Sequence, residues 1–454
     1  MALKKNDEIE LKITDIGVNG EGIGKHDGQA VFVQGALPGD TIRAGITKVK
    51  KSYMYARVIK IISPSPDRIE PACSLSKKCG GCALQDMSYS AELRMKENKV
   101  RSDLIRIGGF PAEEVDRILK PIVGMEGDAV ERYRNKAQFP VGTDREGHVV
   151  TGFFANHSHR IVPVKDCTMC MEENVVITGA IRDFMAMHRI SAYDEETGKG
   201  LIRHILIRKG FSTGDLMVCL VINGDSLPHE ADLISALSAI EGMRSISINI
   251  NIKRNNVIMG DRTENIFGQP FITDFIGDVK YRISPRSFFQ VNPAQTIRLY
   301  SKALEYASLS GNETVWDLYC GIGTISLFLA GHAAKVYGVE VIPEAIEDAK
   351  QNAFINGFDN TEFFVGKAED MDYTGFKKPD VIVVDPPRKG CDTLCLNAIL
   401  SAEPDRIVYI SCDPATLSRD LKILTAGGYR LLEATPFDQF PRSVHCECAC
   451  LLTR

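Results

Sequence analysis

The first 62 residues contain short runs in which apolar and polar positions alternate, a pattern that predicts β-strands. Strands this short and this closely spaced are typical of a small barrel of the OB type. Ser63-Pro64-Ser65-Pro66 then indicates a linker. The predicted strands cover residues 9–16, 30–34, 41–49 and 53–62, with a glycine-rich turn region at 17–24 and a turn at 37–40.

Beyond the linker the pattern changes twice. Residues 89–107 predict a helix that ends at Gly108-Gly109, and mainly strands follow from about 120 to 275. After about residue 285 strands and helices alternate, which predicts a parallel sheet with helices on both faces. We expect three domains: a barrel (1–62), a central α+β domain (63–275) whose helix near 90–108 is a candidate to pack on the next domain, and an α/β domain (276–454).

Composition changes this picture in a few respects. Lys and Arg total 54 against 59 Asp and Glu, so the net charge of −5 excludes a uniformly basic nucleic-acid binder. Residues 41–62, however, carry six basic residues, no acid, and Tyr53 and Tyr55. A basic face with aromatic residues suits single-stranded nucleic acid, although lysines also protect edge strands from aggregation. Neither a membrane span nor a secretory signal is present, so we expect a cytoplasmic protein in which the thirteen cysteines form no disulfide framework.

The α/β segment carries the marks of a nucleotide site. A strand at Thr314–Leu318 leads into a turn containing Gly321 and Gly323, and Glu340 ends the next strand. In nucleotide-binding α/β folds an acidic residue at that position forms hydrogen bonds with the ribose hydroxyls, although it can also be an ordinary surface residue. A later strand ends in Asp385-Pro386-Pro387-Arg388. This order of elements is typical of S-adenosylmethionine (SAM) methyltransferases. It favours them over dehydrogenases, which usually have the fuller glycine motif Gly-x-Gly-x-x-Gly.

Two residues suggest the chemistry. Cys412 follows the strand at 406–411, at the sheet edge where such folds bind ligands, which makes it a candidate nucleophile. Glu447 is the only acid in an apolar strand predicted at 443–452, where it shares a face with His445. A thiolate can add to carbon 6 of uracil, which activates carbon 5 for methylation before a base removes the carbon-5 proton. The other candidates are interpreted as buried hydrophobic residues: Cys219, Cys320, Cys391 and Cys395, and the run Cys446, Cys448 and Cys450 on the opposite face from Glu447.

Several motifs in order along the chain resemble the RNA (uracil-5-)-methyltransferases, specifically the bacterial 23S rRNA type. The resemblance covers almost the whole chain, because residues 1–62 resemble a TRAM domain. The motifs are Ser411-Cys412-Asp413-Pro414-x-Thr416-Leu417-x-Arg419-Asp420, His445-x-Glu447, Asp317-Leu318-Tyr319-Cys320-Gly321-x-Gly323-Thr324, Asp385-Pro386-Pro387-Arg388 and Phe289-Gln290-x-Asn292.

The resemblance implies an α/β fold with a Rossmann-like SAM-dependent methyltransferase domain at the C-terminus and an OB-like TRAM barrel at the N-terminus. It implies that Cys412 is the nucleophile, that Glu447 is the base, and that Phe288 stacks on a flipped-out uracil. Arg134 and Asp385 would contact the RNA. The SAM site would be lined by Gln290, Tyr319, Gly321, Gly323, Glu340 and Asp385.

A cysteine cluster in the central region suggests a metal site. Cys73, Cys79 and Cys82 lie within ten residues, and Cys167 and Cys170 follow later. By themselves these thiols could hold zinc or an iron–sulfur cluster, or could be unliganded core residues. The family resemblance implies a structural [4Fe–4S] cluster on Cys73, Cys79, Cys82 and Cys167, with Cys170 as the alternative fourth ligand.

We therefore expect SAM-dependent formation of 5-methyluridine in 23S rRNA, with no protein partner required. A tRNA (uracil-5-)-methyltransferase is the alternative. A methyltransferase for exocyclic amines would want an aromatic residue where Arg388 stands, and it would leave Cys412 and Glu447 without a role. A further alternative is an RNA-binding assembly factor without enzymatic activity. The intact SAM motifs argue against this alternative.

Overall fold

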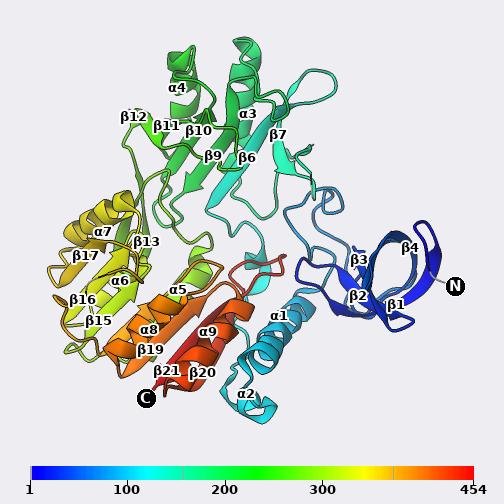
Figure 1. Ribbon diagram of the computed structural model, residues 1–454. Helices are drawn as coiled ribbons and strands as arrows, with labels where there is room; N and C mark the ends of the chain where they lie inside the picture. Colours follow the sequence, from blue (N-terminus) through cyan, green and yellow to red (C-terminus); the bar gives the residue numbers. More distant parts are fainter. Residues whose placement is uncertain (1–2, 157, 372) are drawn as a thin grey trace. The chain divides into compact units, whose positions relative to one another are not determined.

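The computed structural model describes residues 3–156, 158–371 and 373–454, and the chain divides into two compact units (Figure 1). The first unit comprises Met1–Lys96, Phe154–Val162 and Phe440–Val444, and the second comprises Glu97–Phe153, Pro163–Gln439 and His445–Arg454. Within the described ranges, no helix combines the length and the apolar character that crossing a membrane requires.

The first unit contains a closed five-stranded barrel with the strand order β1-β2-β3-β5-β4. The predicted barrel is confirmed, but the expectation of a turn region over 17–24 is wrong in its second half, because β2 begins at Gly22. The glycines there are needed for close packing: a Cβ on Gly22 would lie 2.6 Å from the Ala36 carbonyl oxygen, and one on Gly24 would lie 2.6 Å from that of Lys12. The strands are β1 (Glu8–Ile16), β2 (Gly22–His26), β3 (Gln29–Gln34), β4 (Thr41–Val49) and β5 (Tyr53–Ser63).

The predicted linker is anchored to this barrel. The fully buried Asp40 carboxylate accepts hydrogen bonds from the backbone N–H groups of Leu37 and Ser65, each 2.8 Å long. Arg68 donates to the same carboxylate at 2.6 Å and also pairs with Asp86. A buried charge with this many partners ties the chain after residue 63 to the barrel.

The central region of the second unit is a seven-stranded sheet with the order β12-β11-β10-β9-β6-β7-β8. One face packs against helices α3 (Glu173–Met187) and α4 (Glu230–Ser238), as Figure 1 shows. The other face contributes Leu206, Met217 and Cys219 to a core shared with the C-terminal region. The strands are β6 (Lys136–Thr143), β7 (Val149–Phe154), β8 (Ile161–Pro163), β9 (Ile202–Lys209), β10 (Leu216–Ile222), β11 (Met243–Ile250) and β12 (Arg262–Gly268).

The predicted helix near residue 90 is confirmed. It consists of α1 (Tyr89–Asp103) and the π-helical turn η1 (Leu104–Gly108), and it ends at Gly109 in the left-handed conformation. Val100 and Leu104 share a core with Leu417 and Leu421 of α9 (Pro414–Ala426). The short helix α2 (Ala112–Ile118) adds Val115 to that core, and the 3₁₀ turn η2 (Gly127–Val130) precedes β6.

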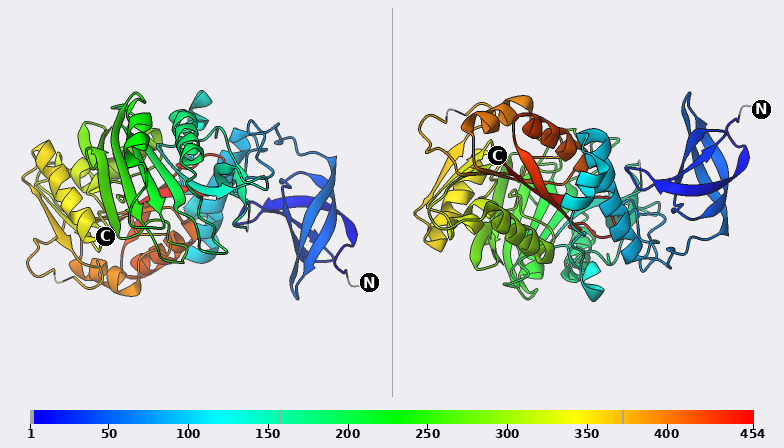
Figure 2. Two further views of the ribbon diagram at one scale, coloured as in Figure 1. Left: turned by 90° about the horizontal axis from the view of Figure 1, so that it is seen from above. Right: turned by 90° about the horizontal axis from the view of Figure 1, so that it is seen from below.

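The C-terminal region confirms the predicted parallel sheet with helices on both faces. Its order is β17-β16-β15-β18-β19-β21-β20, and all pairs are parallel except those that involve β21. Helices α5, α6 and α7 pack on one face, and α8 and α9 pack on the other (Figure 2). The strands are β15 (Thr314–Leu318), β16 (Lys335–Glu340), β17 (Thr361–Val365), β18 (Val381–Val384), β19 (Arg406–Ser411), β20 (Arg430–Phe437) and β21 (Glu447–Thr453), and the helices are α5 (Pro293–Ala307), α6 (Thr324–Ala330), α7 (Pro343–Asn356) and α8 (Thr393–Ala402).

The last strand differs from the prediction in where it begins. β21 starts at Glu447, whereas the alternation predicted a strand from residue 443. His445 therefore lies outside the strand, and its ring nitrogen Nε2 is 3.4 Å from the Arg388 guanidinium. A two-stranded ribbon of β13 (Ile272–Ile276) and β14 (Val279–Ile283) links the central sheet to this region.

Candidate active site

Cys412 stands at the carboxyl end of β19, directly before α9, and its side chain is partly exposed. The turn is held by Asp413, whose carboxylate accepts hydrogen bonds from the N–H groups of Ala415 at 2.9 Å and Thr416 at 3.1 Å. This N-cap starts α9 immediately after the cysteine and thereby fixes the position of the thiol at the sheet edge. The location agrees with a nucleophile that must remain accessible to a substrate.

Charged groups from three strand ends surround this thiol. Burial, Glu447 and Asp385 raise the Cys412 pKa to about 12, while Arg388 acts in the opposite direction. Burial and Asp385 likewise raise the pKa of Glu447 well above its usual value, and Arg388 again opposes them. The structure thus brings Cys412, Glu447, Asp385 and Arg388 together from β19, β21 and the loop after β18. The Oε2 atom of Glu447 is buried without a hydrogen-bond partner among the described residues.

The glycine turn after β15 has the open geometry that a bound nucleotide requires. Tyr319, Gly321 and Gly323 all have positive φ angles, of 76°, 57° and 81°, and a Cβ placed on Gly321 would meet nothing within 4 Å. Glu340, at the end of the neighbouring β16, accepts hydrogen bonds from the N–H groups of Gly321 at 3.2 Å and Ile342 at 3.0 Å. The predicted cofactor residues of this turn therefore lie together at the carboxyl edge of the sheet.

Acidic groups line the same edge. Asp317, fully buried at the end of β15, accepts a hydrogen bond from Ser326 and has a pKa raised by burial to about 7. Burial and the nearby Asp317 raise the pKa of Asp385 to about 7 as well. A cationic sulfonium such as that of SAM would be favoured beside these carboxyl groups. The donor set therefore fits the predicted cofactor.

The loop before α5 carries two further predicted residues. Gln290 is buried, and its side-chain oxygen lies 3.4 Å from the Gln439 amide nitrogen. Phe288, two residues earlier, is 68% exposed, an unusual state for a phenylalanine and a suitable one for stacking on a base. Arg134 lies just before β6, next to Asn135, which donates a hydrogen bond of 2.9 Å to the Gln290 carbonyl.

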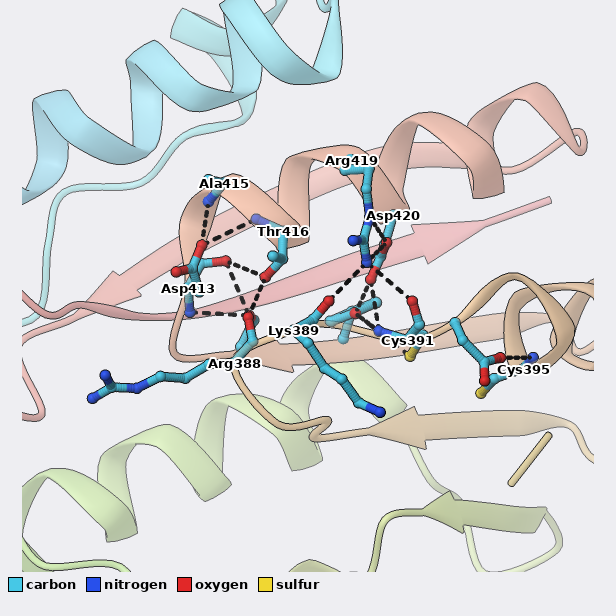
Figure 3. A network of polar contacts seen from close by, with 12 residues as sticks. Arg388, Lys389, Cys391, Cys395, Asp413, Ala415, Thr416, Arg419 and Asp420 are labelled. Atoms are coloured by element: carbon cyan, nitrogen blue, oxygen red, sulfur yellow. Dashed lines mark hydrogen bonds and ion pairs between the residues drawn. The ribbon is translucent and has the colours of Figure 1, made fainter. Parts of the chain in front are cut away.

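A polar network connects the Asp385–Arg388 loop to α9 (Figure 3). The fully buried Asp420 accepts hydrogen bonds from the Tyr409 hydroxyl at 2.6 Å, the Cys391 N–H at 2.9 Å and the Arg419 Nε at 2.7 Å. Arg419 in turn donates to the carbonyl oxygens of Lys389 and Cys391, both at 3.0 Å. This network positions the loop that carries Arg388 relative to the helix that follows Cys412.

The predicted metal cysteines divide between the two compact units. In the first, Cys73, Cys79 and Cys82 are all partly exposed, and the Gly81 N–H donates to the Cys79 Sγ at 3.4 Å. In the second, the Cys167 pKa is lowered to about 6, chiefly by a hydrogen bond from Cys170. Soft thiol donors of this kind fit an iron–sulfur cluster, and the four predicted ligands, Cys73, Cys79, Cys82 and Cys167, are all partly exposed. The cysteines interpreted as buried hydrophobic residues are confirmed as such: Cys219, Cys320, Cys391, Cys395, Cys446, Cys448 and Cys450.

Sequence reasoning missed some residues that the structure places at the site. It gave Arg388 no electrostatic role, and it did not identify Tyr300 of α5, whose pKa is raised by burial and by Asp385, Asp317 and Glu447. The Thr416, Arg419 and Asp420 positions stood in a recognised motif, but nothing in the motif indicated which groups they bind. Their partners lie up to 30 residues away along the chain.

Comparisons with known proteins agree with this geometry. The family model for tRNA (uracil-5-)-methyltransferase matches residues 243–454, and the TRAM domain model matches residues 2–59. An RNA methyltransferase of Halalkalibacterium halodurans is 49% identical over 99% of this chain and 98% of its own length. One of Clostridium acetobutylicum is 48% identical over 100% of this chain and 98% of its own length.

A solved structure is similar over the same extent. The tRNA (uracil-54, C5)-methyltransferase of Pyrococcus abyssi, in complex with S-adenosyl-L-homocysteine, matches with a TM-score of 0.79 and 28% identity. The match covers 98% of this chain and 100% of that one. The chain therefore belongs to the tRNA (uracil-5-)-methyltransferase family of SAM-dependent RNA methyltransferases, and it carries a TRAM domain.

Proposed function

We propose that the protein methylates carbon 5 of a uridine in 23S rRNA, with Cys412 as the nucleophile and Glu447 as the base. The observation that carries this proposal is the convergence of a partly exposed thiol and a buried carboxyl group beside the glycine turn. Each stands at a strand end of the same sheet. An exocyclic-amine methyltransferase would use neither group.

The reaction follows from what these residues can do. The Cys412 thiolate, formed when the thiol gives its proton to solvent, bonds to carbon 6 of a flipped-out uracil, and the ring electrons move to carbon 5 and the carbonyl oxygen. Bound SAM supplies the methyl group that carbon 5 takes up. Glu447 then removes the carbon-5 proton, and the electrons of that C–H bond expel the thiolate and restore the ring. Arg388 favours the ionised forms of both Cys412 and Glu447.

The cofactor and RNA contacts are assigned by position. Gln290, Tyr319, Gly321, Gly323, Glu340 and Asp385 hold SAM, because the glycine turn and the acidic groups lie at the carboxyl edge of the sheet. Phe288 stacks on the target base, and Arg134 and Asp385 contact the RNA. The three proposed parts are an RNA-binding barrel (1–62), a central domain (63–275) and a catalytic domain (276–454).

The barrel supports an RNA substrate. Phe32, Tyr53 and Tyr55 form a surface cluster with ring centroids 5.5–5.8 Å apart. The six basic residues between positions 41 and 62 are all exposed. Aromatic rings beside exposed cations form a surface that suits unpaired bases and their phosphates.

The identity of the RNA is inferred from the domain composition and the cysteine pattern. The TRAM domain and the cysteine pattern favour 23S rRNA, because the tRNA enzymes resembled by the sequence generally lack both. The alternative is a tRNA substrate, and it is favoured by the full-length similarity to the Pyrococcus abyssi tRNA enzyme. Both RNAs therefore belong in the test.

We also propose a structural [4Fe–4S] cluster on Cys73, Cys79, Cys82 and Cys167, supported by their spacing and partial exposure. Protein purified without oxygen should be brown and contain about four iron atoms, as expected for this cluster type. A colourless protein with stoichiometric zinc would contradict this assignment. Substitution of Cys170 that leaves the colour intact would support Cys167 as the fourth ligand.

The decisive experiment incubates the protein with labelled SAM and either unmodified 23S rRNA or unmodified tRNA, followed by nucleoside analysis. We expect 5-methyluridine in 23S rRNA and none with the Cys412→Ala variant. Glu447→Gln should accumulate a covalent protein–RNA adduct, because the thiolate cannot leave while carbon 5 keeps its proton. Normal turnover by Glu447→Gln would exclude Glu447 as the base, and exclusive labelling of tRNA would select the alternative substrate.

A further inference from the structure

Strands β6 and β9 pair side by side in the central sheet (Figure 1), and three basic residues lie on or next to these two strands. Lys136 opens β6 and lies directly opposite Arg208 of β9 in the antiparallel register. Arg134 precedes Lys136 by two residues, and it acts on Lys136 electrostatically, as Arg208 does. Together these residues form the cation cluster (Arg134, Lys136 and Arg208).

Two members of the cation cluster, Lys136 and Arg208, have no ion pair with an acidic residue of the described chain. Among the described residues the Lys136 side chain forms no ion pair or hydrogen bond, and the Arg208 Nε is buried without a partner. Arg208 donates one bond, to the Ser287 carbonyl. Arg134 differs from the other two because the thiols of Cys167 and Cys170 already act on it electrostatically.

This arrangement is energetically unfavourable in the free protein. Like charges on directly opposed strand positions repel each other. Burial, Arg208 and Arg134 together lower the Lys136 pKa to about 7, and burial lowers the Arg208 pKa to about 10. The Cys219 thiol, which acts on Arg208 electrostatically, supplies no negative charge near pH 7, because burial raises its pKa to about 12.

The cation cluster lies at the base of the loop that presents Phe288. Arg208 holds the Ser287 carbonyl, and Asn135 donates from its side chain to the Gln290 carbonyl and from its backbone to that of Val291, both at 2.9 Å. The strand ends that carry the cations are therefore attached to both sides of the exposed phenylalanine. A base stacked on Phe288 would bring its own phosphates to this region.

We propose that the cation cluster binds a phosphodiester of the RNA adjacent to the target uridine, and that Lys136 makes the contact. This inference rests on the proposed function and deepens it, because it assigns the site that receives the backbone of the flipped nucleotide. A phosphate supplies the missing anion and offsets the repulsion between Lys136 and Arg208. The carboxylate of SAM is not the expected ligand, because the predicted cofactor turn follows β15, whereas the cations stand on β6 and β9.

Lys136→Met tests the contact in a Cys412→Ala background, with poly(U) as the RNA so that binding does not depend on methyl transfer. We expect RNA binding to weaken about tenfold and the slope of log K against log salt to fall by about 0.7, the value for one single-strand phosphate contact. Thermal stability should stay the same or rise, because the substitution removes a partly buried charge that has no ion-pair partner. SAM binding should not change.

The matched control is Lys209→Met, which removes the neighbouring lysine that is already paired with Glu173. It should leave RNA binding and its salt slope unchanged. Lys136→Arg keeps the positive charge and should bind RNA nearly as well as the parent protein. Because Lys136 takes up a proton when a phosphate binds, parent RNA affinity should fall as the pH rises above 7, and this dependence should disappear in Lys136→Met.

Unchanged RNA binding by a folded Lys136→Met variant would overturn the proposal, as would a loss of SAM binding in place of RNA binding. If the parent protein methylates neither RNA but Lys136→Met still weakens poly(U) binding, the cation cluster assignment stands and the proposed reaction fails. A loss of stability in Lys136→Met that Lys136→Arg does not restore would indicate a structural role and would also overturn it.

Discussion

Arg388 acts electrostatically on both of the proposed catalytic groups, Cys412 and Glu447. Burial and nearby carboxylates raise the pKa values of Cys412 and Glu447, and Arg388 lowers both. In the proposed reaction both groups act in their deprotonated forms, so removing Arg388 should move the rise of kcat/KM to higher pH. We expect Arg388→Met to lose about tenfold or more in kcat/KM at pH 7, the effect of one pKa unit, and to recover part of this at pH 9.

The control for this prediction is Lys389→Met, which removes the same charge one residue further along. The two side chains extend in different directions from the loop (Figure 3), and Lys389 is not among the groups that shift the Cys412 pKa. The Lys389→Met variant should therefore have the same pH profile of kcat/KM as the parent protein. An equal displacement by both variants would show that only the overall charge of the loop matters.

At the scale of single residues, the sequence predicts where a functional residue lies better than it predicts which charges act on that residue. Cys412 follows a strand and precedes a proline turn, which indicates an exposed thiol, and Glu447 is conspicuous as a charge among apolar neighbours. The electrostatic effect of Arg388 on Cys412 and Glu447 depends on how close three strand ends lie in the folded sheet, and the local sequence pattern does not contain that distance. For the same reason the unpaired state of Lys136 could not be predicted, because the repulsion comes from a residue 72 positions later, opposite in register.

The elements show the same division between local and distant causes. The strands and helices from β15 to α7 follow the predicted pattern, because burial of one face imposes a local periodicity. The glycines of β2 were misleading, since they serve close contact with Ala36 and Lys12 rather than a turn. β17 was not predicted, because only one of its five positions is buried and its sequence therefore lacks a clear apolar face.

The attachment of α9 to the loop after β18 leads to a prediction about stability. Asp420 is fully buried and accepts bonds from Tyr409, Cys391 and Arg419. Asp420→Asn replaces an acceptor oxygen with a donor group and weakens the remaining charge-assisted bonds. We expect the free energy of unfolding to fall by about 2–3 kcal/mol, measured by urea denaturation, together with a lower kcat from the displaced Arg388 loop.

Asp392→Asn provides the matched control in the same loop. Asp392 is exposed and caps α8 by accepting the Cys395 N–H at 2.8 Å, a role that asparagine fills equally well. Its substitution should change the free energy of unfolding by less than about 0.5 kcal/mol. A loss of similar size in both variants would mean that the loop, and not its attachment to α9, determines stability.

At the scale of the whole molecule, the net charge of −5 conceals an uneven distribution. Residues 1–62 hold ten basic and seven acidic residues, a local charge of +3, which leaves −8 for the rest of the chain. The positive charge is concentrated on β4, β5 and the turn between them, where the basic side chains are exposed. An acidic protein can therefore present one basic surface to RNA.

This distribution predicts how the full-length protein responds to salt. Charge reversal of Lys50 and Lys51, exposed in the turn between β4 and β5, should weaken RNA binding and lower the slope of log K against log salt by about 1.4–1.8, the value for two phosphate contacts. Reversal of the adjacent exposed pair Lys377 and Lys378 before β18 changes the net charge equally, and we expect it to alter the slope far less. Equal slopes for the two variants would mean that RNA responds to net charge alone, and the barrel would then have no specific part in binding.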